Sequence, residues 1–175
     1  MPNYGTVNEA NAFFAARLHS YDWDISTVED RLKALTQATE LIDQFNYIGQ
    51  KNTVWELQQN NPDTDWTTDE NRPLIQAAEQ AQETVFPRDA DTEVPVEIET
   101  ACYLIAKALL SGRDPDADLE NSNVRSASYG GVTTRYDTGG NDQEHISHLI
   151  PSPQAYNLIR PFFRERDLFD VKRVS

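Results

Sequence analysis

The chain has 175 residues, with 29 acidic and 15 basic side chains and a formal net charge of -14. This length fits one domain, because domains cluster at roughly 100–150 residues, and no run approaches the roughly 20 apolar residues that a membrane span needs. The single cysteine excludes an internal disulfide and any zinc cluster built from cysteines. The first residues lack the basic and apolar segments of a secretory signal, so we expect a soluble protein in a reducing cytoplasm.

The charge is unevenly distributed along the chain. Residues 51–100 hold twelve acidic against three basic side chains, whereas residues 151–175 hold five basic against three acidic ones. Tight sequence-independent binding of nucleic acid depends on neutralised phosphates, so the acidic body disfavours that function. The acidity is typical of a soluble, self-repelling surface, and a second interpretation is a surface that faces DNA without binding it.

Two capping patterns predict the first helices. Thr6 and Glu9 have the spacing of a capping box, and the apolar residues that follow predict a short amphipathic helix over 7–18. Ser26 and Glu29 repeat the pattern before a helix predicted over 27–46. That second helix carries one continuous apolar stripe: Val28, Leu32, Leu35, Ala38, Leu41, Ile42 and Phe45.

The middle of the chain alternates polar loops with helices. Residues 50–72 are rich in Asn and Asp and weakly periodic, which predicts an elaborated acidic loop. Pro73 is typical of a first helical turn and opens an amphipathic segment that ends near Phe86. Pro95 starts a further helix to Leu110, apolar on most of its circumference, which predicts a central position in the fold.

The hydrophobic period changes after residue 120. Residues 124–129 and 132–136 flank a Gly-Gly pair, the dipeptide that a two-residue hairpin turn prefers, so we expect a β-hairpin there. Ser152 and the proline after it predict a short helix over 153–160. The last residues mix apolar and basic side chains, and two alternatives stay open for them: burial on the chain's own bundle, or docking on another subunit or partner.

The predicted fold is mainly α: a small helical bundle with a β-hairpin and an extended C-terminal arm. Its three parts are residues 1–120 as the bundle core with the acidic loop 50–72, residues 121–150 as hairpin and loop, and residues 151–175 as a docking arm.

The motifs of catalysis give no active site. The chain has no glycine-rich phosphate loop and no nucleophile elbow. His145 and His148 have a spacing that metals accept, but they follow a Gly-Gly break and favour a solvated loop. The acidic residues between 63 and 70 lack the glycine and final glutamate of a calcium loop, and Cys102 falls on an apolar helix face. We therefore expect no enzyme and no catalytic, cofactor or metal site.

Several short motifs follow one another in a fixed order along the chain. They are 7–17 (VNEANAFFAAR), 21–23 (YDW), 31–42 (RLKALTQATELI), 47–51 (YIGQK), 85–88 (VFPR), 94–96 (VPV), 128–132 (SYGGV) and 150–163 (IPSPQAYNLIRPFF). Their order resembles that of the head–tail connector (adaptor) proteins of tailed bacteriophages, which are often labelled DnaT-like single-stranded-DNA-binding proteins. The resemblance covers most of the chain, and residues 52–84 depart from it because they are longer and more acidic than the usual linker of the family.

The resemblance implies a structural protein of the virion, assembled in the host cytoplasm. Such connectors form a ring, commonly of twelve copies, between the portal protein and a neck or tail protein, and double-stranded DNA passes through without specific binding. The resemblance, together with the pattern of apolar and basic residues, marks an arm that contacts the portal or a neighbouring subunit and a hairpin at an inter-subunit seam. The arm residues are Tyr156, Ile159, Arg160, Phe162, Phe163, Arg164, Arg166, Leu168 and Phe169, and the hairpin residues are Tyr129, Val132, Arg135 and Tyr136.

Two other functions remain as alternatives. A DnaT-like replication accessory protein would bind single-stranded DNA, although the acidic balance and the lack of a basic and aromatic stripe disfavour it. A small enzyme with a metal held by His145 and His148 is the second alternative.

Overall fold

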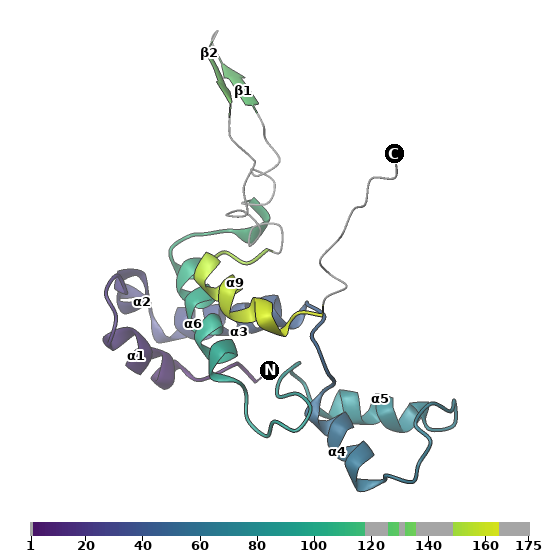
Figure 1. The fold of residues 1–175 in the computed structure, drawn as a ribbon. Helices are drawn as coiled ribbons and strands as arrows, with labels where there is room; N and C mark the ends of the chain where they lie inside the picture. The colour runs from purple at the N-terminus through teal and green to yellow at the C-terminus, as the bar shows by residue number, and fades with distance from the viewer. Residues whose placement is uncertain (1, 118–125, 130–131, 136–148, 165–175) are drawn as a thin grey trace.

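The computed structural model describes residues 2–117, 126–129, 132–135 and 149–164, and these are mainly helical, as the sequence predicts (Figure 1). Within residues 2–117 and 149–164 the structure has no β-strand, only two isolated bridges. The helices of the described residues are α1 (Val7–Ala15), α2 (Tyr21–Ile25), α3 (Val28–Asp43), α4 (Asn52–Asn60), α5 (Arg72–Ala81), α6 (Val96–Leu110), α9 (Pro153–Ile159) and the short 3-10 helix η2 (Arg160–Phe162).

Side-chain caps start two of the helices close to where the sequence predicts. The hydroxyl of Thr6 accepts a hydrogen bond from the Glu9 amide at 3.3 Å, and the Glu9 carboxylate accepts one from the Thr6 amide at 2.7 Å, which confirms the capping box of α1.

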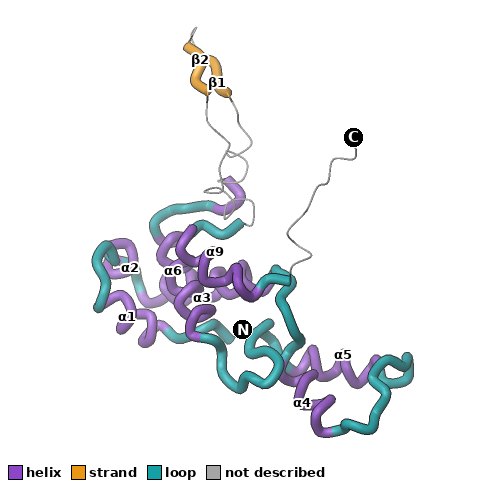
Figure 2. The backbone as a smooth tube through the Cα atoms, viewed as in Figure 1, coloured by secondary structure: helices purple, strands orange, loops and turns teal. Residues whose placement is uncertain are grey.

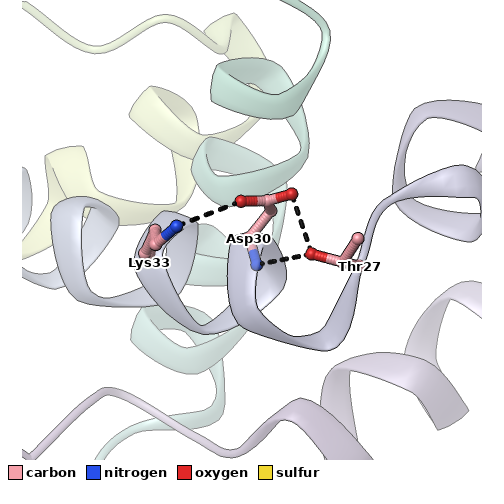
Figure 3. A network of polar contacts seen from close by, with 3 residues as sticks. All are labelled: Thr27, Asp30 and Lys33. Carbon is pink, nitrogen blue, oxygen red and sulfur yellow. Dashed lines mark hydrogen bonds and ion pairs between the residues drawn. The ribbon is translucent and has the colours of Figure 1, made fainter.

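The cap of α3 lies one residue later than the pattern indicates. Thr27, not Ser26, is the N-cap: its hydroxyl accepts from the Asp30 amide at 3.1 Å and donates to the Asp30 carboxylate at 2.8 Å (Figure 3). Lys33 lies 3.3 Å from the same carboxylate, one turn further along the helix. Ser26 instead donates its hydroxyl to the carbonyl of Asp22 and closes α2.

Helix α6 forms the centre of the bundle, as its apolar circumference predicts. It packs against α3 on one side and α9 on another, and α2 also contacts it. The buried residues that α6 and α3 contribute are Ile98, Ala101, Cys102, Tyr103, Ile105 and Ala106 from α6, and Ala34, Leu35, Ala38, Thr39 and Ile42 from α3.

The apolar stripe of α3 is buried only in part. Leu35 and Ile42 are fully buried, but Val28 keeps 65% and Leu32 keeps 52% of its surface exposed. The apolar stripe that the sequence shows is therefore a core face along its middle and later turns and an exposed face at its start.

The predicted acidic loop over 50–72 is wrong for its first half. Residues 52–60 form α4, which packs against α5, and only the stretch between Asn60 and Arg72 is a turn. Figure 2 shows this α4–α5 hairpin extending away from the other helices, with its connecting turn at the far end. Val54 is the single buried residue of α4, so the hydrophobic period of this helix is weak and does not predict it.

Two short strands lie between α6 and α9 in the order of the chain. β1 (Ser126–Tyr129) and β2 (Val132–Arg135) pair antiparallel, with Ser126 opposite Arg135 and Tyr129 opposite Val132. They form a two-stranded sheet of their own, and the bundle contributes no strand to it. The helical bundle itself contains no β-hairpin, and a hairpin as a part of the fold stays a prediction.

The first half of the predicted arm belongs to the bundle. Ser152 caps α9 by accepting from the Ala155 amide at 3.3 Å, as the sequence predicts. Ala155, Tyr156 and Ile159 then enter the hydrophobic core beside α6. Residues 153–159, which the sequence places in the docking arm, therefore pack on the chain's own bundle.

Truncating a buried leucine of α3 should destabilise the protein far more than truncating an exposed one. Leu35→Ala removes a fully buried side chain, and we expect the free energy of unfolding to fall by about 2–5 kcal/mol. The matched control Leu32→Ala, one turn earlier on the same helix, should change it by less than about 0.5 kcal/mol. Urea unfolding followed by circular dichroism measures both, and equal losses would contradict the assigned core.

Candidate functional site

The C-terminal segment is fastened to the bundle beside the end of α3. The amide of Ile48 donates to the Phe162 carbonyl at 2.9 Å, and the amide of Arg164 donates to the Asn46 carbonyl at 3.1 Å. These two hydrogen bonds hold the backbone on both sides of Phe163. Residues 162–164 are therefore bonded to the turn that follows α3.

An aromatic cluster supports this attachment. Phe86 is buried, and its ring centroid lies 4.8 Å from that of Tyr47 and 5.6 Å from that of Phe162. Phe163 lies 5.7 Å from Tyr47 and 5.2 Å from Phe45. Edge-to-face and tilted pairs at these separations each add about 0.5–1.5 kcal/mol beyond burial, so the segment is anchored by packing as well as by its backbone.

A buried polar network lies next to the aromatic cluster. The Tyr4 hydroxyl donates to the Asp43 carboxylate and accepts from the amides of Val85 and Phe86, each at 3.1 Å. Burial, followed by the charge of Asp43, raises the pKa of Tyr4, and burial also raises the pKa of the Asp43 carboxyl. The network joins the N-terminal residues, the end of α3 and the segment that follows α5.

A cavity of about 570 Å³ opens beside this network, between the end of α3, the base of the α4–α5 hairpin and the C-terminal segment. Its lining is mixed in charge. The lining residues are Asp43, Gln44, Phe45, Asn46, Tyr47, Gly49, Gln50, Lys51, Glu79, Val85, Arg88 and Arg164.

Two basic side chains that line the cavity, Lys51 and Arg88, hold neighbouring backbone segments together. Lys51 donates its ammonium to the carbonyls of Glu79 and Gln82 at 3.0 and 2.6 Å, which satisfies the end of α5. Arg88 donates from its guanidinium to the Ile48 carbonyl at 2.8 Å and also to the Gly49 carbonyl. Burial lowers the pKa of Arg88. Because their donors face backbone carbonyls, these cations do not form an anion-binding site.

The described residues contain no arrangement suited to catalysis by a metal or a thiol. No group of three or more His, Cys, Asp and Glu side chains in residues 2–117 and 149–164 lies together as metal ligands would. Burial raises the pKa of the Cys102 thiol to about 12, so this sulfur stays protonated and packs as a small apolar group. His145 and His148 lie outside the described residues. Nor is any helix in the described part long and apolar enough to cross a membrane.

The structure separates the predicted arm residues into three groups. Tyr156 and Ile159 are buried in the core, so their prediction as partner contacts is wrong, because α6 already covers them. Phe162 and Phe163 are half-buried in the aromatic cluster, and Arg160 and Arg164 are exposed. Arg166, Leu168 and Phe169 lie outside the described residues, as does Tyr136 of the hairpin.

The remaining hairpin residues lie in the strands. Tyr129 ends β1 opposite Val132, the first residue of β2, and Arg135 ends β2. Their assignment to an inter-subunit seam stays a prediction.

The sequence patterns did not identify the exposed apolar residues of α2 and of the start of α3. Tyr21 and Ile25 on α2, and Val28 and Leu32 on α3, each keep more than half of their surface exposed. Each pair is four residues apart, the spacing of neighbours on one helix face. That spacing was the signal available in the sequence, but it equally predicts a buried face.

No model of a known protein family, no curated protein and no solved structure matches this chain.

Replacing Asp43 by asparagine should change how stability depends on pH. Burial raises the pKa of Asp43 above its usual value near 3.8, so the folded state holds this proton more tightly than the unfolded state. The stability that the proton contributes is therefore lost as pH rises from about 3.8 through the folded-state pKa. Asp43→Asn lacks this loss, so its stability relative to the unmodified protein should increase over that window.

Urea unfolding of both proteins at intervals from pH 3.5 to 7 measures this difference. Tyr4→Phe serves as a companion variant, because it removes the hydrogen bond that opposes the rise in the Asp43 pKa and should extend the window to higher pH. A difference between Asp43→Asn and the unmodified protein that stays flat with pH would show that Asp43 is as well solvated in the folded state as in the unfolded one.

Gly49 is required at the turn that leads into α4. Its φ is +78°, and a Cβ there would lie 1.9 Å from the Asp89 carboxylate, which accepts from the Gln50 amide at 2.9 Å. Gly49→Ala should therefore cost the left-handed strain of about 1 kcal/mol plus the loss of that hydrogen bond, about 2–3 kcal/mol together.

Gly112→Ala is the matched control for Gly49→Ala. Gly112 has a φ of +84°, and no atom lies within 4 Å of the position that an alanine methyl would take, so alanine there should cost only the strain, about 1 kcal/mol. Thermal unfolding of both variants gives the comparison, and equal losses would mean that the Asp89 contact carries no stability.

Proposed function

We propose that this protein is a structural head–tail connector of a tailed bacteriophage. In this function it forms a ring under the portal, joins the portal to a neck or tail protein, and lets double-stranded DNA pass. The order of motifs along the chain supports the proposal, and so does a mainly helical bundle from which the α4–α5 hairpin extends (Figure 2).

The attachment of the C-terminal segment is the observation that carries the proposal. Backbone hydrogen bonds of Phe162 and Arg164 attach this segment to the bundle, and eleven residues follow in the sequence. Those residues include Leu168 and Phe169 among basic side chains. An arm with a rigid origin loses less conformational freedom on docking than one that starts from a loose tail, which favours a binding role for it.

The negative net charge of the chain is compatible with a channel through which DNA passes. With a net charge of -14 the protein repels the phosphate backbone, so DNA would move past it without being held. The turn of the α4–α5 hairpin holds several of the exposed carboxylates, including Asp63, Asp65 and Asp69. The strand pair β1–β2 has the role of an inter-subunit contact in this proposal, by extension of a neighbour's sheet.

Removal of the arm should abolish docking on the portal. We expect the full chain, mixed with the purified portal protein of the same virus, to form a ring on the tail-facing end of the portal in negative-stain images. A chain that ends at Arg164 keeps Phe162 and Phe163 in the aromatic cluster and should fold, yet leave the portal bare. Circular dichroism and urea unfolding of the shortened chain provide the folding control.

The same samples distinguish the competing function. Portals that carry rings of the shortened chain would contradict the role of the arm. A bare portal together with a gel shift of single-stranded DNA that weakens steeply with salt would replace the connector by a DnaT-like replication accessory protein.

A further inference from the structure

We draw no further inference here: the strongest candidate, the cavity of about 570 Å³ between the end of α3, the base of the α4–α5 hairpin and the C-terminal segment, belongs to the site already described, and because its Lys51 and Arg88 donors face backbone carbonyls, nothing in the structure shows which ligand would fill it.

Discussion

The ring of Phe86 is the point on which the rest of the structure depends. Its centroid lies 6.0 Å from that of Tyr4, 4.8 Å from that of Tyr47 and 5.6 Å from that of Phe162. Its backbone amide also donates to the Tyr4 hydroxyl. The N-terminal residues, the turn after α3, the exit from the α4–α5 hairpin and the C-terminal segment therefore meet at one buried side chain. Because these contacts are long-range in sequence, they need the packed bundle to form.

Local chemistry explains which parts of the fold could be predicted. Caps and hydrophobic period are properties of neighbouring residues, so α1, α3, α6 and α9 lie close to where the sequence places them. The shift of the α3 cap from Ser26 to Thr27 shows the limit, since both positions offer a hydroxyl with an acidic residue three positions later. Helix α4 escaped prediction because Val54 alone is buried, and its remaining stability comes from contacts with α5 that no local pattern encodes.

The candidate site shows a different limit. An apolar residue in a sequence indicates a need for burial, but it does not say which surface provides it. Tyr156 and Ile159 were expected on a partner and are covered by the chain's own α6, whereas Val28 and Leu32 belong to the same apolar stripe as the buried Leu35 and are exposed. How far a partner helix extends along α3 decides the second case, and that length is set by the whole packing. The attachment of Phe163 to the turn at Tyr47 was likewise beyond reach, because it joins residues more than a hundred positions apart.

The closed base of the α4–α5 hairpin makes it a modular insertion. Lys51 and Arg88 pair as an isolated bridge, and the ammonium of Lys51 and the hydroxyl of Thr53 donate to the carbonyls of Glu79 and Ala78 in α5, so the hairpin begins and ends at the same place. Its turn, far from that base, can change in length without moving the bundle. An epitope or an electron-dense label placed between residues 61 and 70 would mark the orientation of the protein in an image while leaving the helical bundle untouched.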